Sequence, residues 1–66
     1  MNADDWVSVS DDLPQLACGM KNVSVTVLAV TDKGDTVRAF YCYRDGEWYN
    51  ERGRRIKEDV IAWQSI

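Results

Sequence analysis

Residues 36–50 read TVRAFYCYRDGEWYN, two runs rich in β-branched and aromatic residues that meet at the Asp-Gly pair 45–46. An Asp-Gly pair between two such runs is typical of a two-residue β-hairpin turn. This turn predicts two cross-strand pairs: Arg44 opposite Glu47, and Tyr43 opposite Trp48. One pair joins opposite charges and the other joins aromatic rings, and both kinds of pair stabilise a sheet. The stretch therefore predicts an antiparallel hairpin.

The segment before this hairpin, NVSVTVLAVT at 22–31, alternates β-branched with small polar residues and then becomes continuously apolar. This pattern predicts a strand that pairs with 36–43. A two-residue turn at Lys-Gly would set Asp32 opposite Asp35, and like charges in a cross-strand pair are unfavourable. We therefore expect a longer loop that holds all of residues 32–35. The expected pairs are then Thr31 with Thr36, Val30 with Val37, Leu28 with Ala39, and Val27 with Phe40.

Both ends of the chain predict short terminal strands. Residues 6–14, WVSVSDDLP, begin as a strand and continue into a turn, because Pro14 disfavours a helix across Leu13. Ser and Asp side chains bond nearby backbone N–H groups in such turns, which leaves Leu13 free to point at the core. Residues 60–63, VIAW, form a last short strand. Four residues are expected to have structural roles, the two tryptophans as covers for the sheet: Trp6, Leu13, Pro14 and Trp63.

In this register both faces of the sheet are apolar. One face carries Leu28, Val30, Val37, Ala39, Tyr41, Tyr43 and Trp48. The other carries Val23, Val25, Val27, Phe40, Cys42 and Tyr49. An antiparallel sheet with one wet face shows apolar residues on one side only, so the second face needs a cover. Either the sheet curls into a small barrel, or a second copy or a partner packs on it.

The predicted fold is mainly β: a small antiparallel meander of three central strands with short terminal strands and at most one short helical turn, at 16–21. The 66 residues make one domain, 1–66, of a size at which a core supplies only about 3–5 kcal/mol of net stability. Residues 1–5 are expected to be disordered. We find no run of the roughly 20 apolar residues that a membrane span needs, and no apolar leader, so the expected location is the cytoplasm.

Catalysis is not expected, because the chain has no histidine and therefore no Ser-His or Cys-His pair. No P-loop or G-x-G-x-x-G motif is present, and the adjacent acids of the chain are typical of solvated turns. Two cysteines alone cannot supply the four ligands of a structural zinc site. The sequence thus predicts a protein that is not an enzyme and uses no metal or cofactor.

Charge and aromatic residues suggest two kinds of binding surface. The net charge is −3: residues 1–20 carry four aspartates and no Lys or Arg, and residues 21–66 carry eight basic and seven acidic residues. This balance argues against a general nucleic-acid binder. The preferred interpretation is a protein-binding surface with aromatic anchors and an arginine rim: Tyr43, Trp48, Tyr49, Arg52, Arg54 and Arg55. The alternative is a nucleic-acid-binding protein that uses the basic loop 52–57.

The order of these motifs resembles a known family. Residues 6–9, WVSV, then Asp-Leu-Pro at 12–14, a valine-rich strand, a Tyr- and Trp-containing middle and VIAW at 60–63 are similar to the phage and prophage family called domain of unknown function 551. Ala62 stands where that family usually has His, so any role of that histidine is absent. The resemblance implies a small accessory protein of a temperate phage. We therefore expect a module that binds and modulates a host protein in the bacterial cytoplasm and forms a homo-oligomer.

Overall fold

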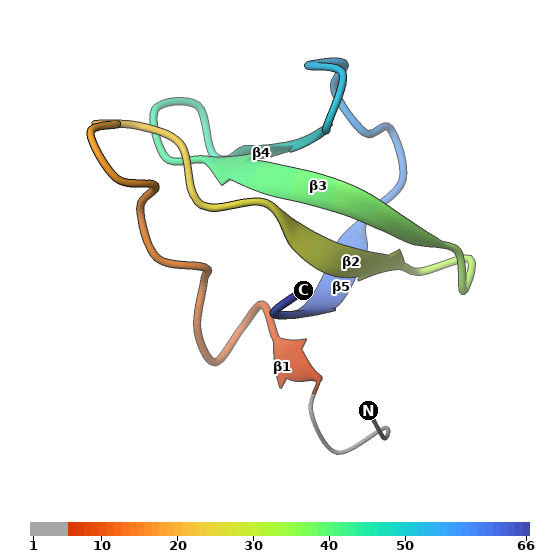
Figure 1. Ribbon diagram of the computed structural model, residues 1–66. Coiled ribbons are helices and arrows are strands. Elements are labelled where there is room, and N and C mark those ends of the chain that lie inside the picture. The colour runs from red at the N-terminus through yellow and green to blue at the C-terminus, as the bar shows by residue number, and fades with distance from the viewer. Residues whose placement is uncertain (1–5) are drawn as a thin grey trace.

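The computed structural model describes residues 6–66, and this part of the chain forms one open antiparallel sheet and contains no helix (Figure 1). The strands are β1 (Val7–Ser8), β2 (Val27–Thr31), β3 (Thr36–Cys42), β4 (Glu47–Asn50) and β5 (Val60–Gln64). Their order in the sheet is β1-β5-β2-β3-β4. The mainly β architecture with a central meander is confirmed, whereas barrel closure and the helical turn at 16–21 are not found. The disorder expected for residues 1–5 lies outside the described residues.

The β2–β3 register differs by one residue from the expected one. Ala29 pairs with Val37, and the Thr31 N–H donates to the Asp35 carbonyl at 2.9 Å, so only residues 32–34 form the loop. Gly34 closes this loop at φ 87°, a left-handed conformation that glycine adopts without steric cost. The charge argument correctly excluded a two-residue turn but placed one residue too many in the loop. Side chains alternate between the two faces along a strand. A slip of one residue therefore exchanges the β3 side chains that share a face with each β2 side chain.

The β3–β4 register differs by two residues. Tyr41, not Tyr43, lies opposite Trp48, and residues 43–46 form the loop. The expected pairs of Arg44 with Glu47 and of Tyr43 with Trp48 are therefore wrong. The Tyr43 N–H instead donates to the Asn22 carbonyl at 2.6 Å. The end of β3 is thus paired with the chain that precedes β2, which keeps it away from β4.

The terminal strands extend the sheet instead of covering one of its faces. β5 lies beside β2, with Ala29 opposite Trp63, and β1 lies beside β5, with Val7 opposite Trp63. Both strands therefore lie in the same sheet as the meander. The two long connections, residues 9–26 and 51–59, supply the side chains that cover the sheet.

The core lies on one face of the sheet, which we call the inner face. Its buried hydrophobic residues are Val27, Ala29, Ala39, Trp48 and Val60. The connections add partly buried residues that pack against these: Val9, Leu13 and Val25 from the first, and Ile56 from the second. Two of the five buried hydrophobic residues are alanines, so this core is small.

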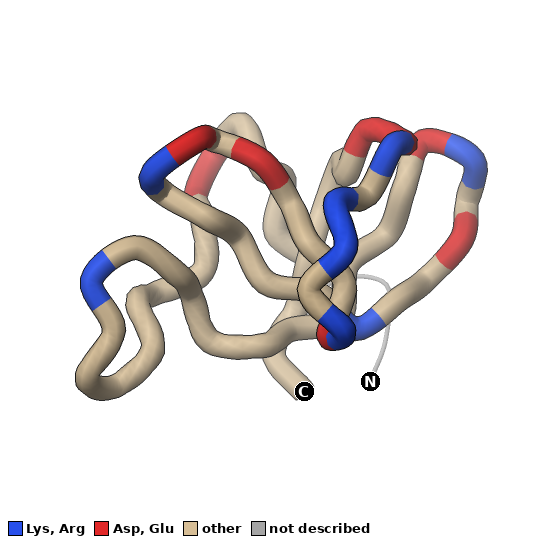
Figure 2. The backbone as a smooth tube through the Cα atoms, turned by 90° about the horizontal axis from the view of Figure 1, so that it is seen from above, with Lys and Arg blue, Asp and Glu red and all other residues tan. Residues whose placement is uncertain are grey.

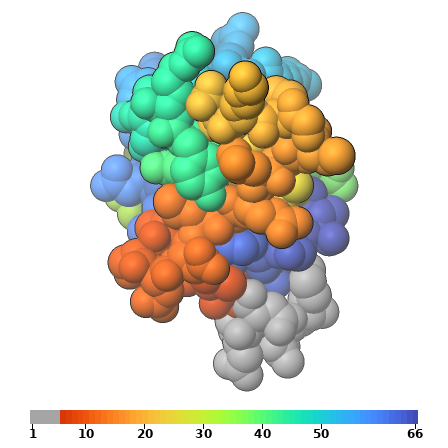
Figure 3. Space-filling model, turned by 90° about the vertical axis from the view of Figure 1, so that its left-hand side faces the viewer, coloured from red at the N-terminus to blue at the C-terminus, as the bar shows by residue number. Residues whose placement is uncertain are grey.

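Hydrogen bonds and apolar contacts hold the first connection against the sheet. The Asp11 N–H donates to the Ser8 carbonyl at 2.9 Å in the predicted turn. Leu13 packs against the core, and Pro14 is fully buried. The Trp63 Nε1–H donates to the Asp12 carbonyl at 3.0 Å. In Figure 3 the segment around residues 10–20 lies directly against the β3–β4 loop.

Candidate interaction surface

The face opposite the core, which we call the outer face, carries a row of apolar side chains. β2 contributes Leu28 and Val30, and β3 and β4 contribute Phe40 and Tyr49, which lie opposite each other in the register. The Phe40 and Tyr49 rings stack with centroids 5.7 Å apart and planes 13° apart. All four side chains are only partly buried. The outer face therefore carries partly exposed apolar side chains together with Arg38 and Thr36, which lie opposite Leu28 and Val30.

The row continues onto the terminal strands. Ala62 lies opposite Val30, and Gln64 lies opposite Leu28, so both face outward. Ser8 lies opposite Ala62 and shares this face. Gln64 is buried, and its Oε1 has no hydrogen-bond partner within residues 6–66. The outer face thus combines an apolar row with one unpartnered acceptor.

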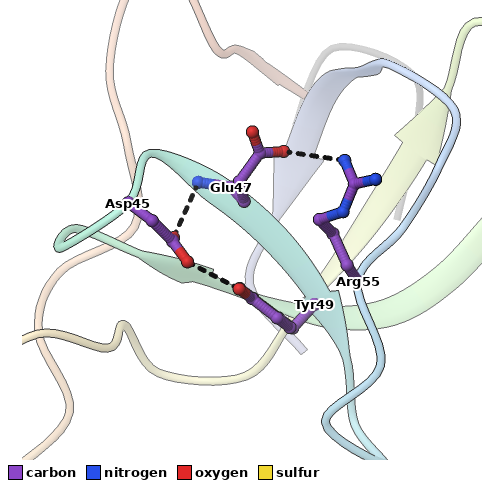
Figure 4. Close-up of polar contacts among 4 residues, drawn as sticks. All are labelled: Asp45, Glu47, Tyr49 and Arg55. Atoms are coloured by element: carbon purple, nitrogen blue, oxygen red, sulfur yellow. Dashed lines mark hydrogen bonds and ion pairs between the residues drawn. The ribbon is translucent and has the colours of Figure 1, made fainter.

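A polar cluster borders this face along β4 (Figure 4). The Tyr49 hydroxyl donates to Asp45 Oδ2 at 2.6 Å, and the Glu47 N–H donates to Asp45 Oδ1 at 3.2 Å. The hydrogen bond lowers the pKa of Asp45, because it favours the carboxylate, and raises the pKa of Tyr49 for the converse reason. Arg55 lies 3.6 Å from Glu47 in an exposed ion pair. These contacts fix the direction of the Tyr49 ring at the rim of the outer face.

The predicted aromatic anchors do not lie on one surface. Trp48 is 8% exposed and belongs to the core, so its ring offers little surface to a partner. Tyr43 is 42% exposed but lies on the inner side, where its ring meets Tyr41 edge to face and its hydroxyl donates to the Pro14 carbonyl. Tyr49 is the predicted anchor that lies on the outer face.

The predicted arginines lie in the turn that follows β4. Asn50 Oδ1 accepts hydrogen bonds from the Arg52 N–H at 2.9 Å and from the Arg54 N–H at 3.1 Å, which shapes the turn. All three arginines are exposed, and the backbone of Arg55 also pairs with that of Tyr49 in an isolated β-bridge. Figure 2 shows basic and acidic positions close together along the connection from β4 to β5. The structure therefore brings Arg55 to Tyr49 and keeps Tyr43 apart from both.

Sequence reasoning missed the apolar row as a unit. The expected register put Leu28 and Val30 on one face and Phe40 on the other, whereas the observed register places all three together. The signal that could have united them is Gly34, because a glycine at the last position of a three-residue loop is a common hairpin arrangement. The length of the β2–β3 loop thus determines which side chains share the outer face.

Comparison of the chain with protein-family models, curated proteins and solved structures finds no match. The resemblance to the phage and prophage family of domain 551 therefore stays a prediction. A search of the part of the chain that the structure describes finds no helix long and apolar enough to cross a membrane.

Proposed function

We propose that this chain is a non-catalytic protein-interaction module that self-associates through its outer face and uses the neighbouring arginine turn to bind a host protein. The observation that supports this best is the partly exposed row of Leu28, Val30, Phe40 and Tyr49 on a chain whose core is small. A contiguous exposed apolar surface on a soluble domain is typical of an interaction site.

Stability favours a second copy as the occupant of this face. A domain of this size draws only about 3–5 kcal/mol from its core. Burying a Leu, Val or Phe side chain contributes roughly 1.5–3 kcal/mol each relative to leaving it exposed. Because the residues of the row are already partly covered, association would add less than this for each of them. Stacking two outer faces would bury the part of these side chains that is still exposed, and only the surplus over the cost of association would stabilise the dimer.

The edges of the sheet favour stacking over strand addition. The free side of β4 is already hydrogen-bonded: the Asn50 N–H donates to the Arg54 carbonyl at 2.8 Å, and the Ile56 N–H donates to the Trp48 carbonyl at 2.9 Å. The other edge strand, β1, has only two residues. Short or covered edges discourage edge-to-edge pairing. Association would therefore take place between faces.

Charge complementarity also favours a second copy. The outer face carries Arg38, opposite Leu28, together with Glu47 and Arg55 near Tyr49. In a two-fold interface the same surface meets itself, so acidic and basic groups beside one apolar row can pair between copies. A face with charges of one sign would repel its copy.

For the host protein, the exposed side chains of Arg52 and Arg54 would form the polar contact, and an acidic partner surface would complement them. This role rests on the implied phage context, in which the module acts in the cytoplasm of a bacterial host. Nucleic-acid binding has less support, because Glu51, Glu58 and Asp59 flank the basic residues. The salt dependence of binding distinguishes nucleic-acid binding from protein binding. The affinity for phosphate groups falls steeply as the salt concentration rises, whereas the affinity of an apolar interface hardly changes.

Intermolecular NMR contacts test the self-association directly. In a sample that mixes isotope-labelled and unlabelled copies, we expect contacts from the Phe40 ring of one copy to the methyl groups of Leu28 and Val30 of the other. Contacts centred instead on Met20 and Leu16, which are exposed on the first connection, would overturn the assignment of the outer face. The absence of any intermolecular contact at millimolar concentration would overturn self-association itself.

A further inference from the structure

The pair Asp45-Gly46, in the loop between β3 and β4, brings together the groups of a reaction within the chain. It is the one place in the sequence where an aspartate or asparagine precedes a glycine. The backbone nitrogen that follows an aspartate can attack the carbon of its carboxyl group. A glycine leaves that nitrogen unhindered, because it has no side chain. This pair is therefore the position at which an acidic side chain reacts most readily with the backbone.

The reaction has two steps and uses water as its only co-reactant. In the first step the Gly46 nitrogen loses its proton and forms a bond to Asp45 Cγ, the bond from Cγ to the hydroxyl oxygen breaks, and water leaves. The product is a five-membered succinimide ring. In the second step water adds to the original main-chain carbonyl of the ring and opens it. The result is isoaspartate, in which the main chain runs through Cβ and Cγ of residue 45.

Both oxygens of the Asp45 carboxylate are held by hydrogen bonds in the folded chain (Figure 4). The Tyr49 hydroxyl donates to Oδ2 at 2.6 Å, and the Glu47 N–H donates to Oδ1 at 3.2 Å. These bonds favour the carboxylate and lower the pKa of Asp45, and the bond from Tyr49 is the largest cause. The neutral acid is the reactive form, because a hydroxyl group leaves more easily than a negatively charged oxygen. The bonds thus keep the group in its less reactive form.

The attacking nitrogen is also held. The Gly46 N–H donates to the Cys42 carbonyl at 2.9 Å, so its proton is not free to leave until this bond opens. Asp45 and Gly46 are both exposed, so water reaches them as soon as the loop opens. The rate of the reaction is therefore set by how often the hydrogen bonds of this loop open.

We propose that Asp45-Gly46 is a site of spontaneous conversion to isoaspartate and that Tyr49 is a positioning residue whose hydroxyl suppresses this conversion in the folded chain. The reaction takes place within one copy and does not depend on self-association. Conversion adds one CH₂ group to the main chain of the loop and moves the carboxylate away from its place beside Tyr49 and the Glu47 N–H. A converted copy therefore lacks the contact that fixes the direction of the Tyr49 ring.

The test follows isoaspartate formation in the full chain during incubation in mildly acid buffer, by fragmentation mass spectrometry of the segment that contains residue 45. The same chain unfolded in guanidinium chloride gives the rate without the folded loop. We expect the folded parent to convert at least about tenfold more slowly than the unfolded chain, because the hydrogen bonds must open first. Equal rates in the two states, or isoaspartate that appears first at Asp32 or Asp35, would overturn the assignment.

Tyr49→Phe tests the role of the hydroxyl. The variant keeps the ring and loses the bond to Asp45, so it should convert about threefold faster than the parent in the folded state. The matched variant is Tyr43→Phe, which also loses one hydroxyl but whose hydroxyl bonds to the Pro14 carbonyl. It should convert at the parental rate. Equal rates for the two variants would contradict the role of Tyr49.

The pH profile of the conversion separates this role from a general loss of stability. The neutral acid reacts, and the bond from Tyr49 lowers the pKa of Asp45 from 3.8. As the pH falls, the carboxyl group of Tyr49→Phe should therefore accept its proton sooner, and its conversion rate should begin to rise at a higher pH than in the parent. Profiles that differ only in height, with the same dependence on pH, would show that the hydroxyl does not act through the Asp45 carboxylate.

Discussion

The Ser24 hydroxyl replaces a backbone carbonyl for Tyr41. The Tyr41 N–H donates to Ser24 Oγ at 2.8 Å, and the hydroxyl donates in turn to the Val25 carbonyl at 2.9 Å. On one side of this contact Val23 pairs with Cys42, and on the other Val27 pairs with Ala39, so the register changes by one residue. The serine thus satisfies the N–H that the irregularity would leave without an acceptor.

Ser24→Ala should therefore destabilise the fold. Ser24 is 3% exposed, so water cannot replace the lost acceptor, and leaving the Tyr41 N–H unpaired should lower the free energy of unfolding by about 1–3 kcal/mol. Urea unfolding followed by tryptophan fluorescence measures this. Ser10→Ala, at an exposed turn position, is the control. Equal stability of the two variants would show that the hydroxyl is dispensable.

Gly34→Ala tests the observed β2–β3 loop. Gly34 has a φ of 87°, and no heavy atom lies within 4 Å of the Cβ that the substitution adds, so the cost comes from the backbone alone. We expect a loss of about 1–2 kcal/mol in the free energy of unfolding, and a smaller loss for Gly34→Asn, because asparagine tolerates the left-handed region better. If Gly34→Ala leaves the stability unchanged, the three-residue loop and the register that depends on it are incorrect.

The Tyr49–Asp45 hydrogen bond predicts two pH effects of opposite sign. The pKa of Asp45 is lowered from 3.8 in the folded state, so its contribution to stability is present above the unfolded pKa and is lost as the pH falls through the folded pKa. The pKa of Tyr49 is raised from 10.0, so its contribution is present below that pH and is lost as the pH rises through the folded pKa.

Tyr49→Phe should remove the alkaline effect, because the titrating hydroxyl is gone, and should weaken the acidic one. NMR titration of the Asp45 carboxyl carbon should show its pKa rise toward 3.8, because the principal cause of the depression is removed. Tyr43→Phe, whose hydroxyl bonds to the Pro14 carbonyl, should leave the Asp45 pKa unchanged. An Asp45 pKa that is the same in the parent and in Tyr49→Phe would show that the two groups do not interact in solution.

Leu28→Lys should prevent self-association and leave the sheet intact. The substitution adds a second cation beside Arg38 on the outer face, where a second copy would have to desolvate it and the two like charges would repel. Met20→Lys, at a residue that is 51% exposed on the first connection, should associate like the parent. Sedimentation velocity gives the association state, and circular dichroism checks the fold. Association of Leu28→Lys at parental strength would place the interface elsewhere.

The sequence predicted where the strands lie in the chain and that the central three form a meander. It did not predict how their residues pair. Alternating valines and aromatic residues indicated β2, β3 and β4, but both registers were wrong because loop length depends on hydrogen bonds that the local pattern does not contain. The bond from the Tyr43 N–H to Asn22, for example, lengthened the Asp-Gly loop. The position of β5 beside β2 rests on contacts between residues far apart in the chain.

The candidate surface was less predictable still. An aromatic residue in a strand serves the core and an interface equally well by composition, so Trp48 and Tyr49, neighbours in sequence, could not be told apart until the register placed them on opposite faces.

The measurement that tests self-association most directly is the solution mass by light scattering over a dilution series from millimolar to micromolar protein. We expect a mass that is a fixed integer multiple of 7.6 kDa across the concentrated part of the series and that falls to 7.6 kDa for Leu28→Lys. A mass of 7.6 kDa for the parent at every concentration would contradict the proposal that the outer face is an interface between copies.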